Sequence, residues 1–248
     1  MSAPTKPKKK GARLGTQSRG DLQSLYNSRG KAVANLWKSY SLKTRRTVVF
    51  TGNLSFLHFL HCESDPSIRW VDYQPRAATA KVGDTLVQTG LSAEVITGYD
   101  VLQLREVRYG NQPRDPKQEI HLERHLGDRL AECESGTHFR DVERKVFTEQ
   151  ELTVGHDVRL RNWNRILPWV AQAKSHSLNL YRTGIISRLD VDRPLAARDV
   201  LALGAGDSGE SALYLAAAIE GAAFGRWNSD LNERPFCEET LFSIRGGA

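Results

Sequence analysis

The sequence predicts a mixed α/β domain followed by a small domain built around two helices. Three observations support this fold class. Short β-branched and aromatic segments alternate with glycine turns between residues 68 and 109, and apolar residues recur at helical intervals between residues 118 and 133. After Pro194 the pattern is a helix, a glycine turn and a second helix. At 248 residues the chain is long enough for two modest cores.

The elements of the first domain follow in order along the chain. Residues 47–50 are β-branched and predict a short extended entry, and residues 54–60 predict a helix that stops at Asp65-Pro66. A meander of hairpins should come next, with strands at 68–73, 77–82, 85–89, 93–97 and 101–109. A helix at 118–133, a last strand at 145–147 and a connecting helix at 160–174 complete the prediction.

The C-terminal part predicts two helices and a wing. Asp207 and Glu210 have capping-box spacing ahead of the second helix, which covers Ser211–Phe224. The wing is expected from residues 226–230 and 240–244. The segment Gly204–Gly209 has the spacing of a dinucleotide-binding loop, but that loop must follow a strand. Because predicted helices flank it, we expect a turn between helices.

Composition describes an ordinary globular protein. Apolar residues make up 40% and charged residues 26% of the chain, and no apolar run approaches the roughly 18 residues of a membrane helix. Nothing apolar follows Lys8–Lys10, so we expect a cytoplasmic protein. The three cysteines lie far apart, which favours free thiols over a disulfide framework or a thiolate zinc site.

The basic charge is concentrated at the N-terminus. Residues 1–46 hold twelve Lys/Arg and one acid, Asp21, for a charge of +11, whereas the other residues hold 23 Lys/Arg and 28 acids, for −5. Residues 1–40 are therefore expected to form a basic segment without a core of its own. Lys8, Lys9, Lys10 and Arg13 would contact DNA phosphates or, as an equally open alternative, only solubilise the chain.

One strand carries a chemically suggestive face. Leu102, Leu104, Glu106 and Arg108 alternate along residues 101–109, so a carboxylate and a cation lie side by side. In PD-(D/E)XK nucleases such a pair, with a carboxylate from the preceding strand, holds Mg²⁺ and orients the attacking water. Glu94 is the candidate for that first carboxylate. An ion pair without catalytic function is the more common interpretation of an acidic and basic strand face.

The order of these features resembles the TnsA subunits of heteromeric DNA transposases, from about residue 41 to the C-terminus. The similarity lies in the basic lead-in Ser41–Phe50, the helix and Asp-Pro stop in Leu54–Ile68, Tyr73-Gln74-Pro75, the Thr-Glu junction in Lys145–Leu152, and Arg161–Leu167. The resemblance implies a restriction-endonuclease-like mixed sheet with flanking helices, followed by a winged-helix-like domain. The domains would then be 41–152 for the nuclease fold, 153–180 for a connecting helix and 181–248 for the winged helix.

The implied active site departs from the family pattern at three positions. Ser55 stands where the family has a metal-binding Glu, Glu94 corresponds to an Asp, and Arg108 replaces a Lys. A serine hydroxyl lacks the negative charge that Mg²⁺ prefers, and arginine is not equivalent to lysine as a compact donor. We therefore expect lost or reduced cleavage, with no cofactor, or Mg²⁺ bound weakly by Glu94 and Glu106.

The resemblance implies a DNA-binding subunit of a transposition complex. Its expected partners are transposon-end DNA, a DDE transposase and an AAA+ regulator, in the bacterial cytoplasm and at the nucleoid when DNA is bound. Lys43, Arg45 and Arg46 are expected to add DNA contacts.

The second helix of the C-terminal domain should bind protein. It has no Arg, Lys, Asn or Gln, the side chains that read a major groove, so Tyr214, Arg226 and Trp227 are predicted protein-partner contacts. Two alternative functions stay open. One is a working Mg²⁺ endonuclease that uses Glu94, Glu106 and Arg108 with a shifted acid such as Glu63. The other is a stand-alone winged-helix regulator.

Overall fold

The computed structural model describes most of the chain from residue 35 onward. The described residues are 35–75, 78–82, 85–88, 90–110, 115–136, 139–190, 193–206 and 208–244. The predicted DNA contacts Lys8, Lys9, Lys10 and Arg13 lie outside these ranges. No helix among the described residues is long and apolar enough to cross a membrane.

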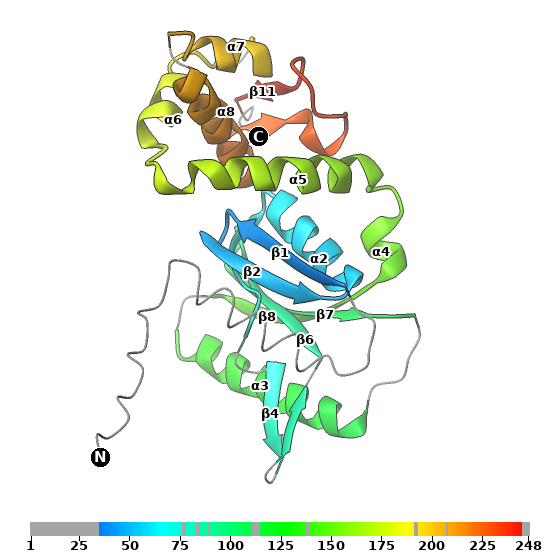
Figure 1. The fold of residues 1–248 in the computed structure, drawn as a ribbon. Coiled ribbons are helices and arrows are strands. Elements are labelled where there is room, and N and C mark those ends of the chain that lie inside the picture. Colours follow the sequence, from blue (N-terminus) through cyan, green and yellow to red (C-terminus); the bar gives the residue numbers. More distant parts are fainter. Residues whose placement is uncertain are drawn as a thin grey trace, which may run out of the picture.

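A mixed four-stranded sheet forms the centre of the first part of the chain (Figure 1). Its strands, in spatial order, are β3 (Ile68–Asp72), β6 (Leu91–Thr97), β7 (Val101–Arg108) and β8 (Asp141–Thr148). The strands β3 and β7 are each antiparallel to β6, which lies between them, whereas β8 is parallel to β7. The parallel pair needs a crossover, which α3 (Pro116–Glu134) provides. The predicted mixed α/β class is confirmed.

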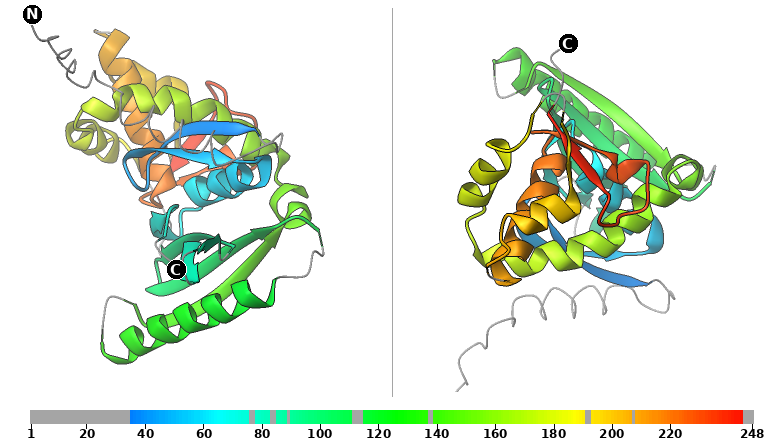
Figure 2. Two further views of the ribbon diagram at one scale, coloured as in Figure 1. Left: turned by 60° about the horizontal axis from the view of Figure 1, so that its bottom comes forward. Right: turned by 90° about the horizontal axis from the view of Figure 1, so that it is seen from above.

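One helix covers each face of this sheet (Figures 1 and 2). Leu102 and Leu104 on β7 pack with Leu122 of α3 in a small core. Gln103 and Arg105, which alternate with these leucines, point the other way, and Arg105 donates to Cys62 of α2 (Asn53–Ser64). Side-chain alternation along β7 therefore assigns even-numbered residues to the α3 face and odd-numbered residues to the α2 face.

The strands before the sheet do not form the simple meander that was predicted. The strands β4 (Thr79–Val82) and β5 (Thr85–Gln88) pair with each other, and β3 pairs with β6 instead. A second hairpin joins β2 (Arg46–Thr51) to β1 (Leu36–Ser41), a strand that was not predicted, because residues 1–40 were expected to form a basic segment without a core. Trp37 of β1 stacks on Phe56 of α2 with ring centroids 4.3 Å apart.

The predicted Thr-Glu junction is a helix cap. Thr148 and Glu151 form a capping box at the start of α4 (Glu149–Thr153). The next helix, α5 (Asp157–Val170), continues into the 3₁₀ turn η2 (Ala171–Ser175), close to the predicted connecting helix at 160–174. Its buried face contains Leu160, Trp163, Ile166 and Leu167, which pack between α2 and the C-terminal part.

The C-terminal part contains the two helices predicted after Pro194, and before them a helix and a short strand that were not predicted. Its elements are α6 (Asn179–Ile186), β9 (Leu195–Ala196), α7 (Ala197–Ala202), α8 (Ser208–Ala223), β10 (Asn228–Ser229), η3 (Asp230–Asn232) and β11 (Leu241–Ser243). The three strands pair in the order β10-β11-β9. Gly204 lies in the α7–α8 turn, where an added Cβ would come within 2.4 Å of the Ser211 nitrogen. This close approach explains a glycine in the turn without a nucleotide.

Two cores hold the described chain together. The smaller one consists of Leu91, Leu102, Leu104, Leu122 and Val142. The larger one runs without a break from Leu42 and Phe59 through Trp163 of α5 to Ala218 and Phe242. The hairpin, α2, α5 and the C-terminal helices are therefore packed as one body.

Candidate metal site and nucleic-acid interface

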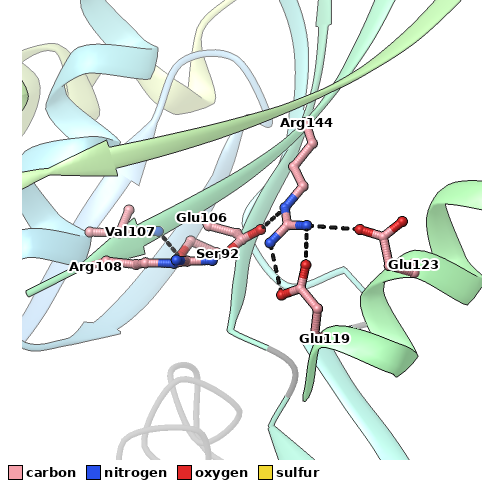
Figure 3. A network of polar contacts seen from close by, with 7 residues as sticks. All are labelled: Ser92, Glu106, Val107, Arg108, Glu119, Glu123 and Arg144. Atoms are coloured by element: carbon pink, nitrogen blue, oxygen red, sulfur yellow. Dashed lines mark hydrogen bonds and ion pairs between the residues drawn. The ribbon is translucent and has the colours of Figure 1, made fainter. Parts of the chain in front are cut away.

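Glu106 is the buried centre of a charged network on β7 (Figure 3). Its side chain is 1% exposed, and its two oxygens are held by different cations. The Oε2 atom accepts from Arg108 Nη2 at 2.9 Å, and the Oε1 atom accepts from Arg144 Nε at 2.6 Å. The predicted pair of Glu106 and Arg108 is thus an ion pair, extended by an arginine on β8.

Arg144 joins Glu106 to two glutamates of α3. Its Nη2 atom lies 3.0 Å from Glu119 Oε2, and its Nη1 atom lies 2.9 Å from Glu123 Oε1. One guanidinium therefore neutralises carboxylates from a strand and a helix, in the position where a bound cation would neutralise them (Figure 3). The sequence analysis missed Arg144, although it lies directly beside β7 in the parallel strand.

Glu94 has a separate set of cationic partners. It lies on β6, and its carboxylate accepts from His125 Nε2 and from Arg129 Nη2, each at 2.7 Å. Burial raises the pKa of Glu94, but the hydrogen bond from His125 and the charge of Arg129 outweigh burial and keep that pKa below its usual value. Glu94 is ionised and already paired.

The predicted four-residue site is not brought together. Glu94, Glu106 and Arg108 lie on the face covered by α3, whereas Ser55 belongs to α2 on the opposite face. Ser55 instead lines a cavity of about 550 Å³ with His58, Tyr73 and Val107. The spacing of residues along β7 shows which side chains share a face of the sheet, but not which helix covers that face. Grouping Ser55 with the two carboxylates is therefore wrong.

Glu63 cannot replace Ser55 as a partner of those carboxylates. It lies on α2, and its buried carboxylate accepts from Ser41 Oγ at 2.6 Å, Tyr73 Oη at 2.7 Å and the Leu42 nitrogen at 2.7 Å. Burial raises the pKa of Glu63, and these donors oppose the rise. Its contacts fix the β1–β2 hairpin on α2, across the sheet from Glu106.

The α2 face of β7 carries polar residues that the sequence analysis overlooked. Arg105 donates from Nε to Gln103 Oε1 at 2.8 Å and from Nη1 to Cys62 Sγ at 3.4 Å. Gln103 in turn donates to Glu143 Oε1 at 2.5 Å. The signal was present in the alternation of Gln103 and Arg105 with leucines. Burial raises the pKa of Cys62, so its thiol is not an activated nucleophile.

Lys43 was predicted to bind DNA, and this prediction is wrong. The side chain is buried, and Nζ donates to the carbonyl oxygens of Asp65, Ile68 and Ala223, each at 2.7 Å. Burial lowers the pKa of Lys43 to about 8, although the charge of Glu63 opposes the shift. A lysine in a basic run was expected to be solvated, but here the run turns into the core. Arg45 and Arg46, in contrast, are exposed at the β1–β2 turn.

The predicted protein contacts differ in their exposure. Arg226 is exposed, and Tyr214 is half-buried with its ring 5.0 Å from that of Tyr181. Trp227 is 2% exposed and donates from Nε1 to the Ala218 oxygen at 2.7 Å, so its prediction as a surface contact is wrong. The indole lies over Gly221, where the missing side chain leaves room for it. An exposed tryptophan on the wing would anchor a partner protein, whereas Trp227 packs in the core of its own chain.

The comparisons with known proteins give no family. No model of a known protein family matches the chain, and no curated protein matches it.

The α3 face offers paired carboxylates but no free metal position among the residues described. No three His, Cys, Asp or Glu side chains in the described ranges are arranged to hold a metal ion. A cation that approached Glu94 or Glu106 would have to displace arginines from a largely buried network, which costs several kcal/mol for each ion left unpaired. The arrangement is suited to holding β6, β7, β8 and α3 in a fixed geometry.

Proposed function

We propose that this chain is a DNA-binding, TnsA-like subunit of a DNA transposition complex, in which a nuclease-type sheet serves as a platform without cutting. The sequence resemblance from residue 41 onward supports this proposal. So does a mixed sheet between α2 and α3, followed by a helix-turn-helix unit with a small sheet. We further propose that the first part is a restriction-endonuclease-like fold and that the last part is a winged-helix-like domain.

One observation supports the proposed loss of cleavage: both oxygens of Glu106 accept hydrogen bonds from arginines, one from Arg108 and one from Arg144. A catalytic Mg²⁺ needs carboxylate oxygens that it can ligate, usually together with water and substrate phosphate. At Glu106 those oxygens accept from guanidinium groups, and at Glu94 they accept from His125 and Arg129. The working endonuclease is therefore the less favoured alternative.

The DNA-binding part of the proposal depends on charge. Residues 1–46 hold twelve Lys/Arg and one acid, and each phosphate contact would release counterions. Lys43 is buried in the core and cannot contact DNA, but Arg45 and Arg46 are exposed at the hairpin turn. The expected ligand is transposon-end DNA, and the expected protein partners are a DDE transposase and an AAA+ regulator.

A stand-alone winged-helix regulator is disfavoured by the packing of α8. Every residue from Leu215 to Ala223 is buried. A recognition helix must expose a continuous face to enter a major groove. With residues 215–223 of α8 enclosed, the exposed Arg226 and the half-buried Tyr214 are left as contacts for a protein partner.

Incubation of the full chain with supercoiled plasmid and Mg²⁺ or Mn²⁺ tests this function. We expect retarded plasmid mobility at low salt and no nicks above a protein-free control, with or without the presumed partners. Metal-dependent nicks that Glu106→Gln abolishes would establish the endonuclease instead. Plasmid mobility unchanged at every salt concentration would remove the DNA-binding proposal.

A further inference from the structure

A basic cavity lies where the β1–β2 turn meets α6 and α8. Its volume is about 320 Å³, and its charged and imidazole side chains are Arg45, Lys174, His176, Arg182 and Glu220. These residues come from the hairpin turn, η2 and its C-terminal end, α6 and α8. Figure 1 shows α6 and the hairpin on either side of the C-terminal end of α5, so the fold itself brings these cations together.

A buried glutamate fixes two of the cations. Glu220 has a side chain that is 6% exposed, and its Oε1 atom lies 3.0 Å from Arg45 Nη2. Its Oε2 atom lies 2.8 Å from Arg182 Nη1, and the other terminal nitrogen of Arg182 contacts Asn179 Oδ1. The arginines are therefore held in place before any ligand arrives, which lowers the entropic cost of binding.

The charge of the cavity suits an anion. Arg45, Lys174 and Arg182 supply three positive charges against one negative charge on Glu220, for a net +2 before His176 is counted. Lys174 is exposed, and no carboxylate pairs with it among the described residues. The cavity also borders Leu178 and Asn179 at the start of α6, where the helix dipole adds positive potential. Guanidinium and ammonium groups together match a phosphate group best.

We propose that this cavity binds a backbone phosphate of DNA and so anchors the nucleic acid on the seam between the hairpin and the C-terminal helices. This inference rests on the proposed function and deepens it, because it assigns a contact point to the described part of the chain, where one of the predicted contacts, Lys43, is buried. The shared chemistry is a phosphate group, which inorganic phosphate also offers.

The test uses the full chain and Lys174→Ala. Lys174 is exposed on η2, so its truncation leaves the core intact. We expect weaker binding of a duplex oligonucleotide for all sequences alike, with the logarithmic salt slope reduced by about 0.9. The control is Arg188→Ala, which removes the same charge just beyond the other end of α6 and outside the cavity.

Thermal unfolding with inorganic phosphate, against chloride at equal ionic strength, separates the two phosphate sources. Loss of duplex affinity in Lys174→Ala but not in Arg188→Ala supports the DNA anchor. Equal losses in both variants would show diffuse attraction and overturn the site, while DNA binding by the protein would stand. Stabilisation by inorganic phosphate that needs Lys174, with duplex binding unchanged, would overturn DNA as the source. Failure of the wild type to bind duplex at all would instead defeat the proposed function.

Discussion

The ammonium nitrogen of Lys43 lies 2.7 Å from the carbonyl oxygen of Ala223, and this hydrogen bond joins the β1–β2 turn to the last turn of α8. The same nitrogen donates to the carbonyl oxygens of Asp65 and Ile68, next to the buried Glu63. Residues 180 positions apart in the sequence thus share one buried polar contact. A buried ammonium group is costly without hydrogen-bond partners. The protonated form of Lys43 therefore requires the hairpin and α8 to stay in contact.

Lys43→Met should change how stability depends on pH. The pKa of Lys43 in the folded chain, about 8, lies below its ordinary value of 10.5, so between these values the unfolded chain binds more protons. The unfolding free energy of the wild type should therefore rise with pH through this window, by about 3 kcal/mol in all. Lys43→Met should lack this rise. Urea denaturation of both proteins at about pH 7 and about pH 10 measures it, and parallel pH profiles would contradict the burial of Lys43.

Arg144→Ala should turn the charged network into a cation site. Without the guanidinium, Glu106, Glu119 and Glu123 lose a shared partner and repel one another, so we expect a loss of roughly 3 kcal/mol of stability. Mg²⁺ or Mn²⁺ should then raise the melting temperature of the variant and not that of the wild type. Differential scanning calorimetry with Arg140→Ala, an exposed arginine just before β8, as the control makes the comparison. A metal-induced rise in the wild type would show that the carboxylates are already accessible.

Deletion of residues 1–20 should weaken DNA binding and flatten its salt dependence. The deletion removes six Lys/Arg and no acid, and each phosphate neutralised contributes about 0.9 to the logarithmic slope on duplex DNA. Fluorescence anisotropy of a labelled duplex over a range of salt concentrations gives the slope. An unchanged slope would assign the affinity to residues 21–248, and residues 1–20 would then be a solubilising segment.

Gly221→Ala should be far more damaging than Gly206→Ala. A Cβ at Gly221 would come within 1.9 Å of the Trp227 ring, whereas a Cβ at Gly206 meets nothing within 4 Å. Overpacking of this kind costs about 1–3 kcal/mol, and Trp227 would also lose its bond to the Ala218 oxygen. Chemical denaturation compares the two variants. A larger loss of stability in Gly206→Ala than in Gly221→Ala would contradict this expectation.

The sequence could predict the elements whose pattern is local. The strand at 101–109, the helix at 118–133 and the helix-turn-helix after Pro194 are found close to the predicted bounds, because turn residues or helix caps in the local sequence mark their ends. The strand β1 could not be predicted from its own segment. Its contacts are the pairing with β2 and the stacking of Trp37 on Phe56 of α2, and both partners lie elsewhere in the sequence.

The site could be predicted only in part for the same reason. Alternation placed Glu106 and Arg108 together, and they form an ion pair. Which helix covers that face depends on the crossover from β7 to β8, so neither the separation of Ser55 nor the approach of Arg144 follows from spacing. Lys43 and Trp227 fit a surface pattern, and their burial depends on Ala223 and Gly221, which are distant or small.

The fragment 181–248 should not fold on its own. Its helices share a continuous core with α5 and the hairpin, so excision would expose α8 where it contacts Lys43 and η2. Trp227 is the single tryptophan of this fragment, so its fluorescence reports folding directly. We expect emission typical of a buried indole in the full chain after subtraction of a Trp227→Phe spectrum, and emission of a solvated indole in the fragment. A cooperative thermal transition with buried emission in the fragment would show an independent C-terminal domain, with residue 181 as a true boundary.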